Sequence, residues 1–349
     1  MISKTGILAG ALLALACAPS ASQARDFTIA AWGGAAQDMQ RNFYFAPLAK
    51  QENIKVQEDV YLGGWGKFQS MVDSKEIVWD VINVETAELE RGCQEGVFLK
   101  LDLAKFGRKA SDFIPGAVTE CGIGAYTFAF AVAYNADKVA QAPKSTADFF
   151  DLKTFPGRRG MRKGAHYNLE FALLADGVPP AEIYKTLSTE AGVARAFKKL
   201  DTIKSQIVWW EAPAQTTELV ASGDVVMAVA PSTRIVEAKG KKPNLRLVFT
   251  PGLIGIDSWV VMKGSPFAET AYKFLAIATD AQQQAAWTNA YPMGPTVVAA
   301  DQHIKAELKA DMPSGPNIVG ALNTSSAEAA QFWADRSDEL NERWNAWLK

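Results

Sequence analysis

The stretch Gly252-Leu-Ile-Gly-Ile-Asp-Ser-Trp-Val-Val-Met-Lys-Gly-Ser-Pro266 places a single carboxylate, Asp257, in the middle of an apolar run. The run has the composition of a buried strand, and glycines bound it on both sides. A buried charge is costly unless an opposite charge or hydrogen bonds compensate it. Asp257 is therefore either a strand-end residue that faces solvent or caps a turn, or a cleft carboxylate that binds a cationic ligand.

The residues after this strand predict two helices and a turn. Residues 267–279 fit one helix, and Asp280 is suited to cap a second, Ala281–Asn289, which Ala290-Tyr291-Pro292 follows. This succession of Asp-containing strand, helix, capped helix and Tyr-Pro turn resembles the periplasmic polyamine-binding proteins of ABC importers, which are family 1 extracellular solute-binding proteins. The resemblance implies that the strand runs between two lobes and that its Asp binds a primary amine.

The first 24 residues have the features of an export signal. Lys4 gives a positive start, Gly6–Ala16 is a short apolar core, and Ser22-Gln23-Ala24 fits a signal-peptidase site. The apolar core is too short to span a bilayer. We expect cleavage after Ala24 and a periplasmic protein. Cys17 leaves a lipoprotein as an alternative, although the leucine usual three places before such a cysteine is absent.

The next part of the chain alternates between predicted strands and helices. Residues 26–31, 54–60 and 78–84 read as strands, and residues 37–51 and 63–72 as the helices between them. This order is typical of an α/β protein with a parallel sheet, whose ligands bind beyond the carboxyl ends of the strands. The three loops at that edge carry Trp32, the segment from Tyr61 to Trp65, and Glu85.

Two further segments extend the resemblance to essentially all of residues 26–349. Gly122–Asn135 corresponds to the first crossing between lobes, and Phe155–Gly160 matches a Phe-Pro-Gly-Arg signature of the family. The implied fold is a type II periplasmic binding protein, in which each lobe is a mainly parallel sheet flanked by helices and two strands cross at the hinge. The implied division is a signal peptide, 1–24, lobe one, 25–133 with 258–300, and lobe two, 134–257 with 301–349.

The composition and the motifs give little support to an enzyme or to a nucleic-acid-binding protein. The formal net charge is −2, and the chain holds two histidines with no cluster at metal-ligand spacing. No Gly-x-Ser-x-Gly motif is present. We therefore predict no enzymatic activity, no metal, no cofactor and no nucleic-acid partner.

Cys93 and Cys121 are the two cysteines outside the predicted export signal. In an oxidising compartment, two cysteines are better candidates for a disulfide than for a metal site. We predict that they pair, and two unpaired buried thiols are the alternative.

The polyamine-binder pattern, carried over residue by residue, implies three site residues. Trp32 matches an aromatic wall, Asp257 the amine-binding carboxylate, and Tyr291 the tyrosine of the Gly-Tyr-Pro turn. Aromatic faces add cation–π attraction of about 0.5–2 kcal/mol to an ammonium ligand. The aromatic that the family has near Gly255 is absent, which predicts extra space there.

Other departures from the pattern concern the distal end of the ligand. The acidic pair of the family falls near Gly164 and Tyr167, so a second amine loses its usual partners. Glu85 stands where the pattern has a hydroxyl, and Arg162 and Arg234 are expected near the cleft. Arginine is the natural bidentate partner of a carboxylate.

These features predict the periplasmic binding component of an ABC importer that closes over a small amine. A polyamine, putrescine or spermidine, is the leading ligand class, and the permease subunits are the expected partners of a monomer. The alternative is a zwitterion such as a GABA-like ω-amino acid, with its amine on Asp257 and its carboxylate on Arg162 or Arg234. A hydrolase or transferase on a similar framework is a third hypothesis, and it lacks a nucleophile–base pair.

Overall fold

The computed structural model describes residues 25–61 and 65–349. The predicted export signal, its cleavage site and the lipidation alternative at Cys17 lie outside the described residues. Within the described residues, no helix combines the length and the apolar character that a membrane crossing needs.

The strands form one sheet in the order β2-β1-β3-β8-β4-β7-β5-β6, and β9 pairs with β8 away from this path. Their bounds are β1 Phe27–Ala31, β2 Val56–Val60, β3 Val81–Val84, β4 Gly122–Asn135, β5 Arg159–Arg162, β6 Ile207–Trp210, β7 Met227–Pro231, β8 Leu245–Val261 and β9 Leu322–Asn323.

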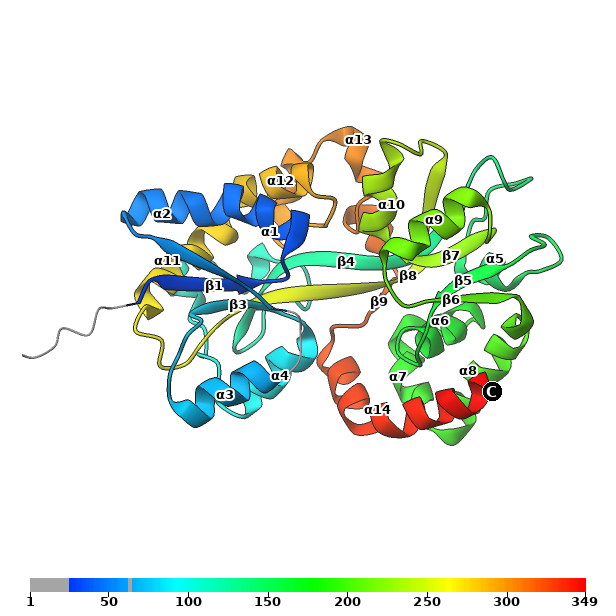
Figure 1. Ribbon diagram of the computed structural model, residues 1–349, viewed down its shortest axis with the longest axis horizontal. Helices are drawn as coiled ribbons and strands as arrows, with labels where there is room; N and C mark the ends of the chain where they lie inside the picture. Colours follow the sequence, from blue (N-terminus) through cyan, green and yellow to red (C-terminus); the bar gives the residue numbers. More distant parts are fainter. Residues whose placement is uncertain (1–24, 62–64) are drawn as a thin grey trace, which may run out of the picture.

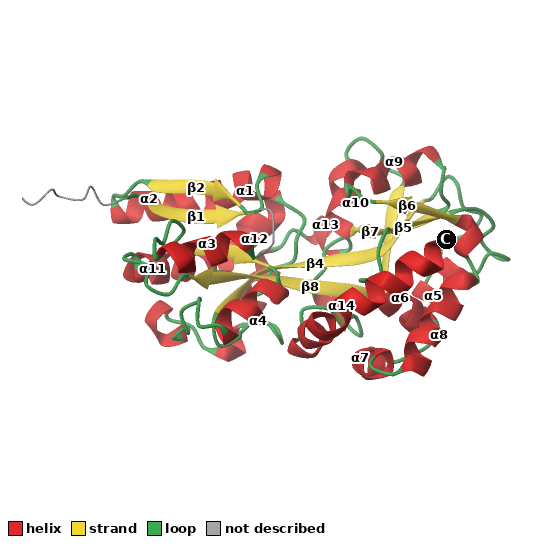
Figure 2. Cartoon of the chain, turned by 60° about the horizontal axis from the view of Figure 1, so that its bottom comes forward, coloured by secondary structure: helices red, strands yellow, loops and turns green. Residues whose placement is uncertain are grey.

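The two ends of this sheet are parallel and its middle is antiparallel. β1 pairs in parallel with β2 and β3, and β5 pairs in parallel with β6 and β7. The long strands β4 and β8 run antiparallel to each other and connect the two halves, as Figure 2 shows. The predicted two-lobe α/β fold with two strand crossings is therefore confirmed.

The helices cover both faces of the sheet in each lobe (Figure 1). Their bounds are α1 Gly34–Gln40, α2 Ala46–Glu52, α3 Gly66–Ser74, α4 Thr86–Gln94, α5 Thr146–Phe150, α6 Asn168–Ala175, α7 Ile183–Leu187, α8 Glu190–Asp201, α9 Ala214–Ser222, α10 Ser232–Lys239, α11 Ala268–Ala278, α12 Ala281–Ala290, α13 Ala306–Lys309 and α14 Ala327–Leu348. A π-helical segment, Arg41–Phe45, joins α1 to α2.

Strand alternation divides the core of lobe one into two layers. Ile29 of β1 packs with the α11 and α12 side, whereas its neighbour Ala30 packs with the α3 and α4 side. Successive side chains of a strand point to opposite faces, so a strand covered by helices on both sides is apolar throughout. In lobe two the largest cluster lies among α5, α6, α7, α8 and α14. Each lobe thus has its own core.

β8 is longer than the sequence predicted. It begins at Leu245, several residues before the quoted stretch, and pairs with β4 along most of its length. The predicted lobe boundaries at 133/134 and 257/258 consequently fall inside continuous strands, and they remain predictions.

A candidate ligand-binding site between the lobes

Asp257 lies on β8 opposite Tyr126 of β4, in the middle of the strands that connect the lobes. Its side chain is buried, with the residue 5% exposed. The Tyr126 hydroxyl lies 2.6 Å from Asp257 Oδ2, and Asp257 Oδ1 is buried with no hydrogen-bond partner. A buried carboxylate oxygen without a partner is costly, so it is a candidate acceptor for a ligand. Asp257 therefore fits the cleft interpretation rather than the solvent-facing one.

Tyr126 can serve both protonation states of Asp257. Its hydroxyl also lies 2.9 Å from Asn83 Oδ1, and the Asn83 amide donates to the Ser258 carbonyl. Because the hydroxyl has one hydrogen, it donates to an ionised Asp257, or accepts from a protonated Asp257 while donating to Asn83. The hydroxyl can therefore bond Asp257 in either state, but Asn83 Oδ1 receives its hydrogen only when Asp257 is protonated.

The groups around Asp257 favour its protonated form. Burial raises the pKa of Asp257 well above its usual range and the Glu85 carboxylate raises it further, while Tyr126 and the Trp32 indole oppose the rise. An ammonium ligand stabilises the ionised form and reverses this shift.

Trp32 and Glu85 bring two loops of lobe one to this carboxylate. Trp32 follows β1 and packs 5.0 Å from the Tyr61 ring. Its buried indole N–H lies near enough to the Asp257 carboxylate to lower the pKa of Asp257, but it forms no hydrogen bond of normal geometry. Glu85 stands at the N-terminus of α4 and is accessible to solvent. Protein on both sides still partly desolvates it, so its pKa is raised, with Glu88 adding to the rise and Arg162 opposing it. Lobe one thus provides an aromatic wall and a second acid.

Arg162 and Tyr167 face this cluster from lobe two. Arg162 ends β5 with its side chain exposed, and its guanidinium lies 5.5 Å from the centre of the Tyr167 ring. Burial raises the pKa of Tyr167, as do the negative charges of the nearby Glu85 and Asp257. The positive φ of Tyr167, 70°, costs on the order of 1–3 kcal/mol for a residue with a side chain. The Asn168 amide holds this loop through the carbonyls of Arg162 and Gly164, at 2.6 and 2.7 Å.

Arg234 and Tyr291 meet at the other side of the cleft. Arg234 lies in the first turn of α10 and forms an ion pair with Glu237, with Nη1 3.1 Å from Oε2. Tyr291 follows α12 of lobe one and is buried. Burial raises the pKa of Tyr291 to about 12, Glu237 contributes to the rise, and Arg234 opposes it. The α10 helix of lobe two therefore faces the end of α12 here.

The structure does not bring Trp65 to Asp257. The Trp65 ring packs 5.2 Å from Phe68, the Arg91 guanidinium lies 4.4 Å over it, and its indole donates to Gln69. It completes an apolar cluster beneath α3 and α4 because Phe68 and Phe98 already occupy that layer. The predicted space at Gly255 is also filled, since Phe128 crosses it so closely that a Cβ would meet the ring at 2.0 Å.

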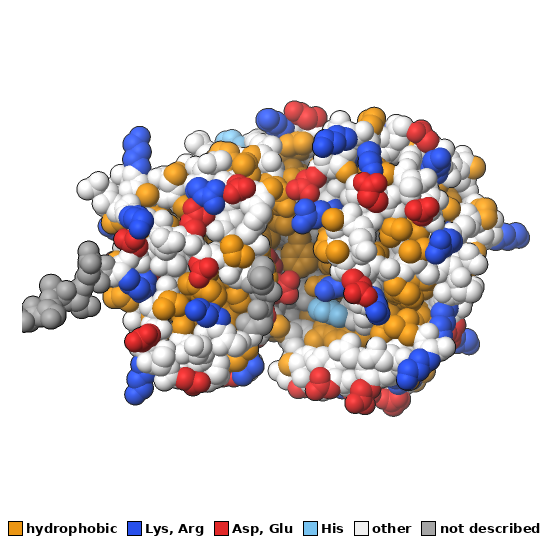
Figure 3. Space-filling model, viewed as in Figure 1, with side chains coloured by type: hydrophobic (Ala, Val, Ile, Leu, Met, Phe, Trp, Pro, Cys, Tyr) orange, Lys and Arg blue, Asp and Glu red, His pale blue; other side chains and the backbone are white. Residues whose placement is uncertain are grey.

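A groove separates the two halves of the molecule and is lined by apolar and charged side chains (Figure 3). A cavity of about 730 Å³ lies between α4 of lobe one and α14 of lobe two, with Glu85, His166, Tyr167 and Trp333 in its wall. Asp257, Trp32 and the two arginines do not line this cavity. Asp257 is the candidate ligand site, because its buried carboxylate oxygen Oδ1 has no hydrogen-bond partner. The cavity, whose wall holds the similarly unpartnered His166 Nε2, lies beside it between α4 and α14.

Sequence patterns alone missed the partners that hold the site. Tyr126 was hidden in an apolar run, and only the antiparallel register of β4 and β8 identifies it as the partner of Asp257. His166 stacks between Tyr167 and Trp333, at 3.9 and 4.5 Å, and burial lowers its pKa to about 3. It is therefore a neutral wall residue at ordinary pH.

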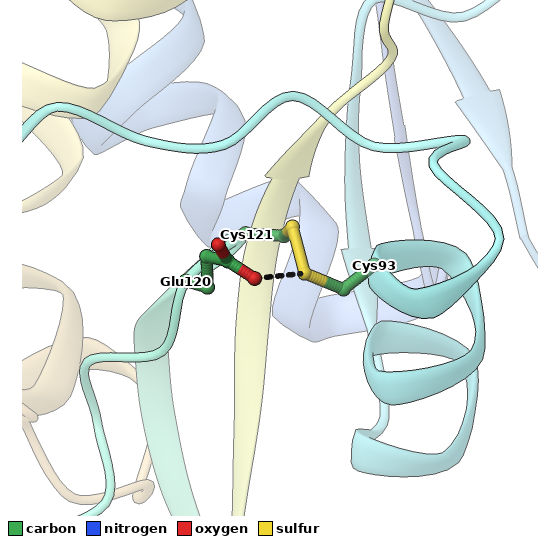
Figure 4. A group of neighbouring side chains, drawn as sticks. All are labelled: Cys93, Glu120 and Cys121. Carbon is green, nitrogen blue, oxygen red and sulfur yellow. Dashed lines mark hydrogen bonds between the residues drawn. A yellow bond between two sulfur atoms is a disulfide. The ribbon is translucent and has the colours of Figure 1, made fainter.

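A disulfide joins Cys93 near the end of α4 to Cys121, which directly precedes β4 (Figure 4). The chain-entropy model assigns about 3–4 kcal/mol to a crosslink over such a separation, 28 residues. It ties the helix that carries Glu85 to the strand that carries Tyr126. Among the described residues, Cys93, Glu120 and Cys121 form a group compact enough to hold a metal ion. Both sulfurs are used in the disulfide, so this group offers no thiolate ligand.

Residues 44–314 match the family model for bacterial extracellular solute-binding proteins. A gamma-aminobutyric acid-binding protein of Pseudomonas aeruginosa PAO1 is 42% identical over 336 residues, which cover 96% of this chain and 94% of that protein. A solved GABA receptor has 31% identity and a TM-score of 0.80, over 93% of this chain and 98% of the other. An ABC transporter substrate-binding protein of Bradyrhizobium japonicum USDA 110 has 31% identity and a TM-score of 0.81, over 93% and 99%. The chain belongs to the bacterial extracellular solute-binding proteins, and it is the substrate-binding component of an ABC importer rather than an enzyme.

Proposed function

We propose that this protein captures a small ω-amino acid of the GABA type in the interlobe cleft. The observation that carries the proposal is the buried carboxylate of Asp257, whose Oδ1 has no hydrogen-bond partner. Tyr167 approaches it from lobe two, and the same lobe carries Arg162 and Arg234. The ligand ammonium binds Asp257, and its carboxylate binds Arg162 or Arg234. The two relatives named for GABA, at 42% and 31% identity, support the same ligand class.

This ligand class replaces the polyamine that the sequence resemblance favoured. An ammonium on Asp257 suits a polyamine and an ω-amino acid equally. The distal end separates them, because Arg162 and Arg234 repel a second amine and attract a carboxylate. The fold and the amine end of the resemblance are thus retained, and its distal end is revised.

Ligand capture then depends on closure of the lobes. A ligand favours the closed form only through contacts that the open form lacks, and a zwitterion held by Asp257 and an arginine of lobe two provides them. Trp32 and Tyr291 act as aromatic walls, and Glu85 and Tyr167 limit the cleft toward α14. We further propose that the mature protein begins at Arg25 in the periplasm, acts as a monomer and delivers its ligand to the permease.

Calorimetry with ligands that differ by one functional group tests this proposal. GABA, its five-carbon homologue, putrescine, butyrate and n-butylamine are titrated into residues 25–349. We expect GABA or its homologue to bind at least about 100-fold more tightly than butyrate or butylamine, since each of these lacks one charged anchor. Equal binding of butylamine and GABA would remove the carboxylate from the proposal, and tightest binding of putrescine would restore the polyamine.

Arg162→Ala and Arg234→Ala then identify the carboxylate partner. The arginine that binds the ligand should cost GABA affinity about 100-fold or more when it is removed, while affinity for butylamine stays the same. The other arginine serves as the matched control. If neither substitution affects GABA, the carboxylate is bound elsewhere.

A further inference from the structure

Glu237 is the acidic residue that directly accompanies an arginine of the cleft. It lies one helical turn after Arg234 on α10, and the two side chains form an ion pair at 3.1 Å with 30% and 44% of their surfaces exposed. Exposed pairs at this spacing are common and contribute little to stability. The Arg234–Glu237 pair differs from such pairs because it lies close to a residue of lobe one.

The Glu237 carboxylate lies beside the hydroxyl of Tyr291, a buried residue of the opposite lobe. Tyr291 packs 5.9 Å from Trp287, and Trp287 stacks 5.0 Å from Tyr126. Tyr126 in turn contacts Asp257 at 2.6 Å. Packed aromatic side chains of the lobe-one core therefore connect Asp257 to Tyr291, which lies near the Arg234–Glu237 pair.

This pair presents both signs of charge to the end of the cleft. A ligand carboxylate is attracted by Arg234 and repelled by Glu237, and a second ammonium experiences the opposite forces. The pair is neutral as a whole, so the balance between its members decides which distal group is accepted. Specificity of this kind needs a repulsive element as well as an attractive one.

We propose that Glu237 is a specificity-determining residue that sets the discrimination between ω-amino acids and diamines. The proposal rests on the proposed function, because it requires the ligand amine on Asp257, and of the two arginines offered there it takes Arg234 as the partner of the ligand carboxylate. The Glu237 carboxylate weakens GABA binding by repelling the ligand carboxylate, and it strengthens putrescine binding by attracting the second ammonium.

The test measures GABA and putrescine affinities of Glu237→Gln, which keeps the shape and the acceptor oxygen of the side chain. We expect GABA to bind roughly fivefold or more tightly and putrescine to bind more weakly by a similar factor, from removal of one charge at close range. Arg234→Gln should have the reverse effect, with weaker binding of GABA and tighter binding of putrescine. Glu237→Asp keeps the charge and should keep the ratio of the two affinities within about threefold.

Glu218→Gln is the matched control. Glu218 lies on α9, is 76% exposed and pairs with Lys242 at 2.7 Å. Its substitution removes the same charge from lobe two and should leave both affinities unchanged. If Glu237→Gln moves both affinities in the same direction, or leaves their ratio within twofold of the parent, the inference is wrong.

Asp257→Asn separates this outcome from failure of the proposed function. If Asp257→Asn loses both ligands and Glu237→Gln changes neither, the amine site stands and only the role of Glu237 fails. If Asp257→Asn binds both ligands as the parent does, the proposed function itself fails.

Discussion

Asp257 and Glu170 are two buried carboxylates with nearly the same immediate partners. Each lies near a tyrosine hydroxyl and a tryptophan indole, and each keeps one oxygen without a hydrogen-bond partner. Glu170, in the first turn of α6, accepts from the Trp333 indole at 2.6 Å and from the Tyr184 hydroxyl at 3.5 Å. Burial raises the pKa of both, that of Glu170 to about 7.

The two sites differ in what surrounds these partners. Asp257 is within electrostatic reach of Glu85 in lobe one and of Tyr167 in lobe two, next to the interlobe groove. Glu170 is fully buried within lobe two, beneath α14. Burial and an unpaired oxygen therefore do not identify a ligand site by themselves. Groups that converge from both lobes do identify a ligand site, because only a ligand that contacts both lobes stabilises the closed form.

The largest difference should appear when each carboxylate becomes an amide. Asp257→Asn should weaken binding of any amine ligand by two to four powers of ten, because removing one partner of a buried charge pair costs about 3–5 kcal/mol. Calorimetry with GABA provides the measurement, and Glu170→Gln is the matched control with unchanged affinity. Parent-like affinity of Asp257→Asn would remove the distinction between the two sites.

Glu170→Gln should instead change how stability depends on pH. The pKa of Glu170 is about 7 in the folded protein against a usual value of 4.5, so the folded state binds the proton more tightly. The stability that protonated Glu170 contributes should be fully present below pH 4.5. It should be lost as the pH rises from there through 7. Linkage gives a loss on the order of 3 kcal/mol.

The amide cannot ionise, so the unfolding midpoints of parent and Glu170→Gln should agree near pH 4 and diverge by pH 8, with the variant more stable. Thermal unfolding followed by circular dichroism across this range measures the divergence. Parallel profiles would show that Glu170 titrates normally.

Tyr126→Phe should have an intermediate effect, confined to the Asp257 site. The hydroxyl stabilises the ionised carboxylate, so its loss raises the pKa of Asp257 further and favours the proton over the ligand. We expect GABA affinity at pH 7 to fall about tenfold, from loss of about 1–1.5 kcal/mol. The affinity should recover as the pH is raised, and a loss that does not depend on pH would contradict the role of Asp257 ionisation.

Tyr184→Phe should have the smallest effect. The Tyr184 hydroxyl is 3.5 Å from Glu170, at the limit of a hydrogen bond, while Trp333 remains at 2.6 Å. We expect a stability change below about 1 kcal/mol and no change in ligand affinity. A loss as large as that of Tyr126→Phe would mean that the two tyrosines play the same role.

Much of the fold could be predicted from local patterns. The long apolar passage Gly122–Asn135 is a strand over those same residues, and Asp280 caps α12 by accepting from the backbone of Gln282 and Gln283. The first half of β8 was not predicted. Its residues Leu245–Val248 precede a proline and a glycine, which indicate a turn on local grounds. The β4 ladder is interrupted there, between Val248 and Leu253, and the strand continues because the pairing resumes on the far side.

Only part of the candidate site could be predicted from the sequence. A lone acid in an apolar strand is visible in a sequence, so Asp257 could be found. Its partner Tyr126 depends on strand register, which local patterns do not contain. The Arg234–Glu237 pair is a local i,i+3 contact, but its position near Tyr291 depends on lobe packing. Trp65 shows the converse, because its loop lies at the correct sheet edge while its ring packs inward against Phe68.

The irregularities of the β4–β8 ladder have a mechanical consequence. The pairing shifts between Gly124 and Tyr126 and again between Phe130 and Val132, so a regular segment lies between two bulges. Bulges bend and twist a strand more easily than regular ladders do. Hinge rotation should therefore concentrate at these two points, while the regular ladder segment that holds Tyr126 opposite Asp257 moves as a rigid body. One residue inserted into this segment would turn Asp257 to the opposite face of the sheet, whereas surface loops would tolerate the same insertion.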